Sequence, residues 1–400
     1  MSKTIVITHS PYLNRDVYVQ YDNKEAVEIN IISNNQNSLL GNIYIGKVKN
    51  LVKNISAAFV EISKNQVCYF EPEKENDIIF VSRQSPNKLC EGDEILVQVS
   101  KDAHKNKRPF VTANLNFPGK YVVLTSGNKS ISMSSKLSAE NRAALNNIAS
   151  SFENEEFGLI FRTNAKEASE EDIFKEINQL KNEFQTVKEN ANHKRAFATV
   201  KLGTPDYISS ILGLYDQSNV EKIITDNEDY YNTIKEFVKK SRPEFLSRIV
   251  LHNDNQITLN ALYGVDSDVK EATNKKVWLK SGGYLFIEPT EAMTVIDVNS
   301  GKAVSKKKAK DTFLKINMEA AKEISKQLRV RNISGIIMID FIDMENEEDK
   351  STLMDYMKSL VKPDPVKTTV VDITKLNLME ITRKRIKKSL SETLVDNNES

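Results

Sequence analysis

The sequence predicts a protein of several domains that combines α/β and α+β units. Three observations lead to this expectation. The chain has 400 residues, more than one hydrophobic core normally organises. Short alternating apolar stretches, typical of half-buried antiparallel strands, run through its first part. From Val277 onward, apolar strand-like stretches flank long helical patterns instead.

Two groups of strands are predicted in the N-terminal region. Residues 4–32 contain the alternating stretches TIVITHS, DVYVQYD and AVEINII, and a polar break, SNNQNS, follows them. Five further β-like segments, separated by turn or charge clusters, lie between Gly41 and Asn116. Five strands in roughly 75 residues favour a small closed barrel of the OB type.

The middle of the chain mixes helices and strands. Residues 119–205 join the strands KYVVLTS and EFGLIFRTN to helices whose apolar residues recur every three or four positions, which predicts a compact α+β unit. Residues 206–278 alternate helix and strand again, and Pro243 and Gly264 mark breaks.

An α/β layered domain is predicted after residue 277. The strands YLFIEP, AMTVIDVN, GIIMIDFIDM and KTTVVDIT flank helices. One of these helices spans 311–329, and its apolar face is traced by Leu314, Met318, Ala321, Ile324 and Leu328. The tail SETLVDNNES, residues 391–400, is expected to be disordered.

Composition limits the function classes. The net charge is +1, from 56 basic and 55 acidic residues, so polyanion binding must depend on local patches. Cys68 and Cys90 have no C-x-x-C partner, and neither a disulfide framework nor a structural zinc site is expected. Because no run of eighteen apolar residues and no signal-peptide core occur, we expect a cytoplasmic protein without membrane contact.

Two aspartates stand inside stretches that read as buried strands, Asp297 in TVIDVNSG and Asp340 in GIIMIDFIDM. Asp is depleted in strands and is almost never fully buried without a partner. If the helix at 311–329 joins two strands of one sheet, both carboxylates reach a common edge. They would then repel by about 4 kcal/mol at about 4 Å and an effective dielectric of about 20, which demands a shared proton or a cation. Mg²⁺ suits such a pair, with Mn²⁺ as an alternative ion.

Two neighbouring residues, Asn299 and Asp343, are expected to differ in whether they take part in the site. Asn299 lies two residues after Asp297, so on a strand it faces the same side and can orient that carboxylate or a water. Asp343, three residues after Asp340, is expected to face elsewhere. The other interpretation is that these aspartates only end strands and cap helices or turns, and spacing alone leaves both interpretations open.

The motifs around the aspartates carry a family resemblance. VIDVNSGKA, NMEAAKEISKQLRVRNISGIIMIDFIDM and DITKLNLMEITRKR resemble the catalytic region of the bacterial ribonuclease E/G family. GNIYIGKVKNLVKNISAAFVEI resembles the S-one-type RNA-binding barrel of that family, and the resemblance covers essentially residues 1 to 390. It implies a Mg²⁺-dependent endoribonuclease for single-stranded, A/U-rich RNA. Such an enzyme leaves 5′-phosphate and 3′-hydroxyl ends and acts in rRNA processing or mRNA decay, with Asp297 and Asp340 as metal ligands.

The resemblance also implies a domain order. An RNase H-like scaffold, residues 1–37 and 206–278, would be interrupted by the OB-type barrel at 38–117 and by a 5′-phosphate sensor subdomain at 118–205. A DNase I-like catalytic domain would follow at 279–390, before the disordered tail at 391–400.

RNA-contacting residues follow from the resemblance as well. Phe59 and Tyr69 match exposed aromatic residues of the family's barrel, where Tyr69 replaces a phenylalanine, and aromatic rings there stack on bases. Lys107 and Lys101 match positions that contact RNA phosphates. The alternatives are that the rings belong to the barrel core and that the lysines form a solvated charge run.

Arg162 and Thr163, at the end of the strand GLIFRTNA, match the family's pocket for a 5′-monophosphate. A guanidinium fork beside a hydroxyl suits a terminal phosphate, although Arg162 could also be an ordinary exposed strand-end residue. The sequence departs from the family before the next helix, where SMSSKL with Lys136 replaces a paired-arginine segment, so sensing is expected to be weaker.

Two basic runs could contact RNA phosphates or form solvated faces. One is KKKAK at 306–310, and the other lies on LMEITRKRIKK, predicted as a helix that presents Arg383, Lys384, Arg385, Lys387 and Lys388.

Relatives commonly continue beyond the position of Leu390 into a zinc-linking Cys-Pro-x-Cys segment and a small dimerising domain. The sequence has no such cysteines, so a zinc-linked dimer is not expected and a monomer is credible.

Two further function classes stay open: a non-catalytic RNA-binding protein of the same fold and a nuclease directed at DNA. The four histidines form no H-E-x-x-H motif and no i, i+4 pair, which argues against a histidine-dependent hydrolase.

Overall fold

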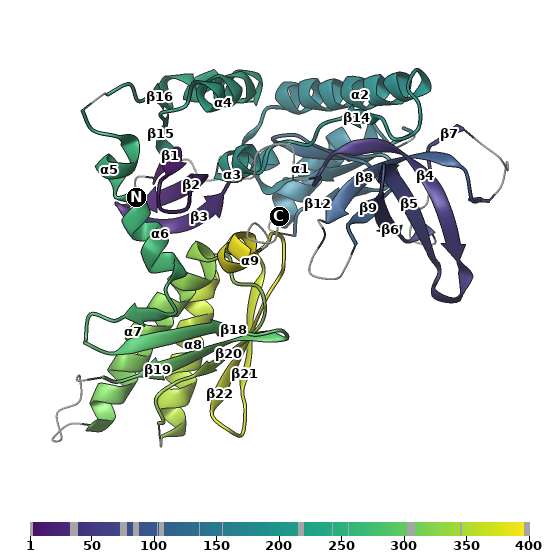
Figure 1. Ribbon diagram of the computed structural model, residues 1–400. Helices are drawn as coiled ribbons and strands as arrows, with labels where there is room; N and C mark the ends of the chain where they lie inside the picture. The colour runs from purple at the N-terminus through teal and green to yellow at the C-terminus, as the bar shows by residue number, and fades with distance from the viewer. Residues whose placement is uncertain are drawn as a thin grey trace. The chain divides into compact units, whose positions relative to one another are not determined.

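The computed structural model describes residues 3–32, 39–72, 78–82, 88–101, 103, 108–135, 137–153, 155–214, 220–241, 243–254, 256–301, 309–344 and 346–395. Over these residues the chain forms four β-sheets with flanking helices (Figure 1). It divides into two compact units. Unit 1 comprises Met1–Ile32, Asn219–Val238 and Glu244–Ser400, and unit 2 comprises Ser33–Ser218 and Lys239–Pro243. The expectation of a mixed architecture with several sheets is confirmed.

Unit 1 contains a five-stranded sheet built from two separate stretches of chain. Its order is β16-β15-β1-β2-β3, with β1 parallel to β15 and antiparallel to β2. Buried valines of this sheet pack with α5 and α6, which meet at Gly264, whose φ of +68° lets the chain turn sharply. The elements are β1 (Lys3–Ser10), β2 (Arg15–Asp22), β3 (Glu25–Ile31), β15 (Val220–Thr225), α4 (Glu228–Ser241), η4 (Pro243–Arg248), β16 (Ile249–Leu251), α5 (Leu259–Tyr263) and α6 (Val265–Thr273).

Unit 1 also contains a six-stranded sheet, ordered β17-β18-β19-β20-β22-β21. Strands β19 and β20 are parallel and are joined by α7, whereas the other neighbouring pairs are antiparallel. The elements are β17 (Lys276–Trp278), β18 (Tyr284–Pro289), β19 (Met293–Asn299), α7 (Ala309–Val330), β20 (Gly335–Asp340), α8 (Glu347–Val361), β21 (Thr368–Ile373), β22 (Leu378–Arg383) and α9 (Leu390–Val395).

One face of the six-stranded sheet is covered and the other is open. Helices α7 and α8 lie side by side, and their apolar side chains pack with Ile296, Val298 and Ile339 of the sheet (Figure 1). The predicted apolar face of the helix is confirmed, since Ala321, Ile324 and Leu328 are buried and Leu314 and Met318 pack partly buried against the same core. The face opposite these helices carries the polar and exposed residues and is called the open face below.

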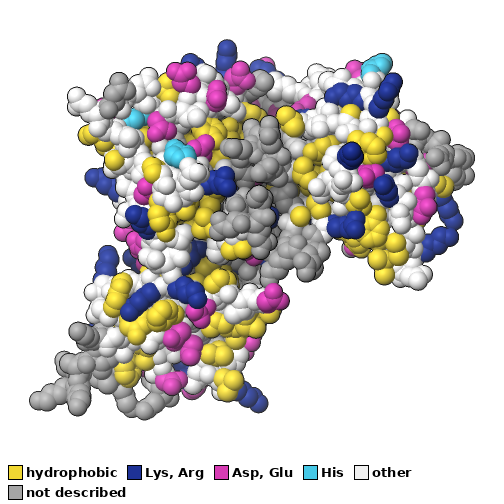
Figure 2. Space-filling model, in the orientation of Figure 1, with side chains coloured by type: hydrophobic (Ala, Val, Ile, Leu, Met, Phe, Trp, Pro, Cys, Tyr) yellow, Lys and Arg dark blue, Asp and Glu magenta, His cyan; other side chains and the backbone are white. Residues whose placement is uncertain are grey.

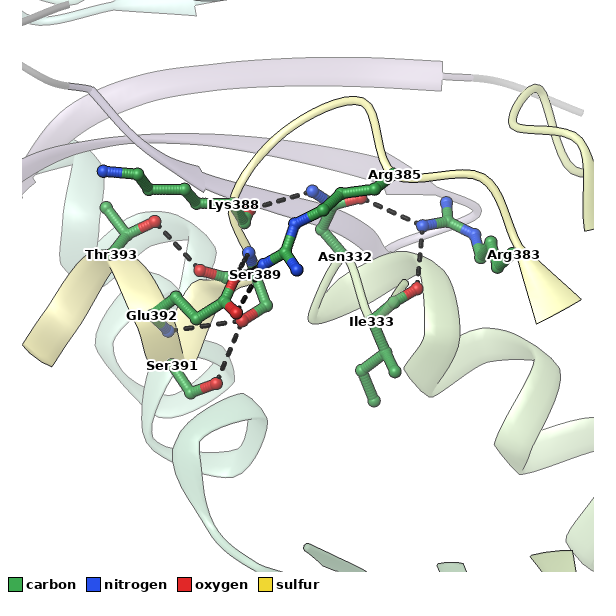
Figure 3. Close-up of polar contacts among 9 residues, drawn as sticks. All are labelled: Asn332, Ile333, Arg383, Arg385, Lys388, Ser389, Ser391, Glu392 and Thr393. Carbon is green, nitrogen blue, oxygen red and sulfur yellow. Dashed lines mark hydrogen bonds and ion pairs between the residues drawn. The ribbon is translucent and has the colours of Figure 1, made fainter. Parts of the chain in front are cut away.

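The expected disorder of residues 391–400 is wrong for its first half, because residues 391–395 belong to α9. The helix begins with a reciprocal cap: Ser389 Oγ accepts the Glu392 N–H at 3.2 Å, and Glu392 Oε2 accepts the Ser389 N–H at 2.9 Å (Figure 3). This is the capping-box pattern S-x-x-E. Leu390, which is buried, attaches the helix to the core. Residues 396–400 lie outside the described part.

The predicted helix over LMEITRKRIKK is also wrong, because Leu378–Arg383 forms strand β22. Buried and exposed positions alternate along it, and Arg383 faces inward with only 4% of its surface exposed. Its guanidinium binds Asp364 at 2.8 Å. It also donates to Asn332 Oδ1 and to the Ile333 carbonyl (Figure 3). Arg383 therefore stabilises the fold and is not available to phosphate, whereas Lys384 and Arg385 are exposed.

Unit 2 contains the predicted barrel. Strands β4, β5, β6, β9 and β8 pair in that order, and β8 pairs back to β4, which closes the barrel. These five strands coincide with the five segments predicted between residues 41 and 116, and the closed five-stranded form is consistent with an OB-like domain. The elements are β4 (Ile43–Val52), η1 (Lys53–Ile55), β5 (Ala57–Ser63), β6 (Gln66–Phe70), β7 (Phe80–Ser82), β8 (Glu94–Lys101), β9 (Phe110–Thr112) and β14 (Thr199–Lys201), of which β7 and β14 flank the barrel.

A four-stranded sheet with two helices completes unit 2. Its order is β10-β11-β13-β12, and α1 and α2 supply Leu145, Ile177 and Phe184 to the core that it shares with the barrel. The elements are β10 (Asn116–Pro118), β11 (Val122–Thr125), β12 (Ile131–Met133), α1 (Ala139–Ser150), β13 (Gly158–Phe161), η3 (Thr163–Glu167), α2 (Glu170–Asn192) and α3 (Asp206–Leu214).

Neither cysteine is paired. Cys68 is buried in the barrel core, where burial raises the pKa of its thiol to about 12, and Cys90 is partly exposed. Among the described residues, no helix combines the length and the apolar character needed to cross a membrane.

Candidate active site and RNA-contact surfaces

Asp297 and Asp340 lie side by side on the two parallel strands of the six-stranded sheet. Asp297 on β19 and Asp340 on β20 are direct register partners, and α7 is the connection between the strands. Neighbouring strands are spaced about 4.8 Å apart, so the two carboxylates project from adjacent positions of one sheet. This is the juxtaposition that the sequence predicted for them.

Both aspartates are exposed, so the expectation that they are buried is wrong. Along β19 the side chains of Thr294, Ile296 and Val298 are buried, whereas Asp297 falls on the alternate, open face. Among the described residues, α7 and α8 both pack on the opposite face of the strand. The carboxylates therefore need no partner to be tolerated in the strand, and their repulsion is moderated by water.

The electrostatics of the pair are nevertheless unfavourable to two negative charges. The pKa of Asp340 is raised from the ordinary value of 3.8 first by desolvation, then by the charges of Asp297 and Asp343. Asp343, expected to face elsewhere, thus lies close enough for its charge to act on Asp340. The charges of Asp297 and Asp343 both act on Asp340 at the end of β20, and a bound cation would relieve this repulsion.

Two asparagines organise this carboxylate site. Asn299 Nδ2 donates a hydrogen bond of 2.6 Å to Asp297 Oδ2, which fixes that carboxylate as the sequence predicted for a helper two residues away. Asn317, fully buried on α7, binds the backbone of Ile342 twice: its Nδ2 donates to the Ile342 carbonyl at 2.8 Å, and its Oδ1 accepts the Ile342 N–H at 3.1 Å. The backbone of the segment that carries Asp340 and Asp343 is therefore fixed by α7.

The donor set fits a hard divalent cation. Mg²⁺ is typically bound through one or two carboxylates and keeps several waters, which two exposed aspartates in register can accommodate. Within the described ranges, no three His, Cys, Asp or Glu side chains converge into a protein-only metal cage. The residues that could hold an ion are Asp297 and Asp340.

The barrel of unit 2 carries a cluster of aromatic side chains on its outside. Phe59 and Tyr69 are register partners on β5 and β6, with ring centroids 6.2 Å apart, and Phe110 on β9 lies 5.3 Å from Tyr69. All three are partly exposed, whereas their strand neighbours Val60 and Phe70 fill the barrel core. The rings that the sequence singled out do not belong to that core. Phe110 was missed, although it too alternates with a buried residue.

Cations accompany these rings. Lys101 lies 5.2 Å from the Phe110 ring and Arg108 lies 5.2 Å from the Phe59 ring. Lys107 lies outside the described residues. On the face drawn in Figure 2, lysines and arginines are interspersed with hydrophobic side chains over the barrel. The net charge of +1 had led us to expect that cations would be concentrated in local patches.

Arg162 and Thr163 lie together at the end of β13. Arg162 Nη1 donates to the Gly119 carbonyl at 2.9 Å, and Thr163 Oγ1 is 2.8 Å from Ser134 Oγ. Arg142, which the sequence analysis did not consider, donates through Nη2 to the Ser134 carbonyl at 3.2 Å. A second guanidinium thus reaches the SMSSKL segment, in which Lys136 lies outside the described residues. The side chains of the basic run KKKAK at 306–310 also lie outside the described part.

Comparison with known proteins gives consistent matches. The model of the Ribonuclease E/G family matches residues 116–386. Ribonuclease G of Haemophilus influenzae is 33% identical over 380 residues, which cover 92% of this chain and 77% of that protein. Ribonuclease G of Escherichia coli K12 is 30% identical over 406 residues, covering 98% and 82%. Ribonuclease E of Nostoc sp. is 32% identical over 373 residues, and the match spans only 53% of its length.

The family model matches more than half of the chain, and the relatives match it nearly from end to end at 30% identity or above. Both kinds of match include the strands that carry Asp297 and Asp340. The chain belongs to the ribonuclease E/G family.

Proposed function

We propose that this chain is an endoribonuclease that cuts single-stranded RNA at the open face of the six-stranded sheet. The observation that carries the proposal is the direct register of Asp297 and Asp340 on parallel strands, with Asn299 bonded to Asp297. Membership of a family whose relatives are named ribonucleases supports it.

Asp297 and Asp340 would hold Mg²⁺, or Mn²⁺, in their ionised forms. When bound, that ion would neutralise charge on a phosphate oxygen and lower the pKa of a water. Asn299 keeps Asp297 in one orientation, and Asn317 fixes the backbone beyond Asp340. Cleavage by water at phosphorus would leave the 5′-phosphate and 3′-hydroxyl ends that the family resemblance implies.

The remaining surfaces would bind the RNA strand. Phe59 and Tyr69 would stack on bases while Lys101 and Lys107 neutralise phosphates, which suits a barrel that binds single strands without reading their sequence. Arg162 and Thr163 would bind a 5′-monophosphate, since the guanidinium is already oriented by Gly119 and the hydroxyl by Ser134.

We assign the subdomains accordingly: an RNase H-like scaffold at 1–37 and 206–278, the OB-type barrel at 38–117, the 5′-sensor at 118–205 and a DNase I-like catalytic domain at 279–390. rRNA processing or mRNA decay in the cytoplasm is the proposed setting.

The test is cleavage of an unstructured RNA that carries a 5′-monophosphate. Wild type and the variants Asp297→Asn and Asp340→Asn are compared with Mg²⁺ and with a chelator. We expect cleavage by wild type only with the metal, and a loss of roughly 1000-fold in each variant, the rate equivalent of about 4 kcal/mol. Glu288→Gln is the matched control, because Glu288 is an exposed carboxylate on the same open face.

The outcomes separate the candidate functions. Equal cleavage by all forms would eliminate the proposed site. RNA binding without cleavage by wild type would favour a non-catalytic RNA-binding protein, and preferential cleavage of the matched DNA strand would favour a DNA-directed nuclease.

A further inference from the structure

Three aromatic side chains stand beside the aspartates on the open face and take no part in the site described above. Trp278 is on β17, and Tyr284 and Phe286 are on β18. Trp278 is 65% exposed and Phe286 is 37% exposed. Isolated exposed hydrophobic residues are common on protein surfaces, but a contiguous exposed cluster beside a candidate active site indicates a binding surface.

The strand register places this cluster directly against the carboxylate site. Phe286 is the cross-strand partner of Asp297, and Tyr284 is the partner of Asn299. Trp278 is in turn the partner of Tyr284. Because neighbouring strands are about 4.8 Å apart, the row Asn299–Tyr284–Trp278 spans roughly two strand spacings, or about 10 Å, and the row Asp297–Phe286–Lys276 lies beside it on the same face.

The rings form one connected surface with a cation on it. Trp278 and Tyr284 have ring centroids 5.4 Å apart, and Tyr284 and Phe286 have centroids 5.6 Å apart, both edge to face. Lys276 Nζ lies 3.9 Å from the Trp278 centroid and 3.8 Å from the Tyr284 centroid. A cation held on aromatic rings beside carboxylates places positive charge where a polyanion would pass.

We propose that Trp278, Tyr284 and Phe286, with Lys276, form a stacking platform for a nucleobase of the RNA strand next to the bond that is cut. The inference rests on the proposed function. Aromatic rings bind bases of any sequence through their faces, and the ammonium group of Lys276 complements the adjoining phosphate. The platform thereby positions the strand across Asp297 and Asp340, and the edge of the sheet acts on the RNA separately from the barrel.

Trp278 gives a direct readout, because it is the only tryptophan in the chain. In the Asp340→Asn form, a short 5′-monophosphorylated oligoribonucleotide should quench its fluorescence saturably. The same oligonucleotide with one abasic position next to the cleavage site should quench less. In otherwise wild-type protein, Trp278→Ala should raise KM for RNA by roughly 5- to 100-fold, the loss expected for one base stack, and Trp278→Phe should restore most of it.

Tyr12→Ala is the matched control, since Tyr12 is exposed and has Lys270 5.0 Å from its ring centroid but lies in the turn between β1 and β2 of the other sheet of unit 1. Its KM should equal that of wild type. Circular dichroism checks that each variant is folded.

If RNA leaves the Trp278 fluorescence unchanged and Trp278→Ala has the KM of wild type, the platform proposal is wrong. The proposed function is tested separately, by the cleavage rate of Asp297→Asn. A change in sedimentation on Trp278→Ala with KM unaltered would instead make this face a contact between copies of the chain and would also overturn the platform proposal. Quenching by RNA in a protein that cleaves nothing would uphold base binding and defeat the endoribonuclease proposal alone.

Discussion

Two carboxylate sites, one in each unit, have raised pKa values for different reasons. Glu176, on α2 of unit 2, accepts the backbone N–H groups of Lys120, Tyr121 and Val122 at 2.6, 2.7 and 2.9 Å. Burial raises its pKa, while these three donors and Arg162 act to lower it. For the exposed Asp340 in unit 1, partial desolvation and the charges of Asp297 and Asp343 all raise the pKa.

The two sites differ in the source of the groups that stabilise the negative charge of the carboxylate. The protein itself supplies hydrogen-bond donors to Glu176, so that carboxylate ties α2 to β11 and serves the fold. At Asp340 the neighbours increase the cost of the charge, and compensation must come from outside the protein. The cause of a pKa shift therefore separates a structural carboxylate from a candidate metal ligand, whereas its direction does not.

The largest expected effect tests whether Asp297 and Asp340 act as one unit. Each Asn substitution should reduce the cleavage rate roughly 1000-fold, and the double substitution should reduce it little further, because one bound ion needs both carboxylates. Single-turnover rates of the two single variants and the double variant measure this. Losses that multiply in the double variant would mean that the two aspartates act independently.

A large effect on stability, and not on chemistry, is expected at Glu176. Glu176→Ala leaves three backbone N–H groups without their acceptor and should lower the free energy of unfolding by about 2–5 kcal/mol. Urea unfolding measures it, and Glu189→Ala, an exposed position on the same helix, should change little. Asp297→Asn should leave the unfolding free energy almost unchanged, since Asp297 is exposed. Similar stability losses in both would erase the contrast between the sites.

The sequence was most informative where one residue pattern has few structural solutions. The five short strands closed into a barrel. The α7 crossover makes β19 and β20 parallel, and in this sheet they are also neighbours, which puts Asp297 beside Asp340. The exposure of the aspartates was misjudged, although the alternation of Ile296, Asp297 and Val298 is the pattern of a strand covered on one face.

Other errors come from local signals and from long-range partners. The capping box from Ser389 to Glu392 was present in the sequence and overlooked. Arg383 reads as one more cation in a basic run, and only its distant partner Asp364 makes it a buried residue. No prediction was made for Glu176, because its three donors lie more than fifty positions earlier in the chain.

An intermediate effect, on RNA affinity alone, is expected at the barrel. Phe59→Ala or Tyr69→Ala should raise KM for single-stranded RNA roughly 5- to 100-fold with little change in kcat, because stacking contributes about 1–3 kcal/mol per base. Tyr69→Phe keeps the ring and should resemble wild type. Steady-state kinetics on one RNA measures both constants. A fall in kcat with unchanged KM would mean that the barrel contributes to the chemical step, and its role would then not be separate from that of the aspartates.

The smallest expected effect is a pH dependence at Glu176. Its pKa in the folded protein lies above the ordinary value of 4.5, so the folded state holds the proton more tightly than the unfolded chain does. That contribution to stability is fully present below pH 4.5 and is lost as the pH rises through the folded pKa. Glu176→Gln keeps the shape but cannot titrate, so the wild type should lose stability relative to this variant as the pH rises from about 4 to 7.

Paired urea unfolding of wild type and Glu176→Gln across that pH range cancels the other titrating groups and leaves the Glu176 contribution. The opposite slope, with the wild type gaining on the variant as the pH rises, would mean that the three N–H donors outweigh burial. Glu176 would then favour its charged form within the protein. Its difference from Asp340 would be larger, because hydrogen-bond donors of the protein would stabilise the Glu176 charge without an external cation.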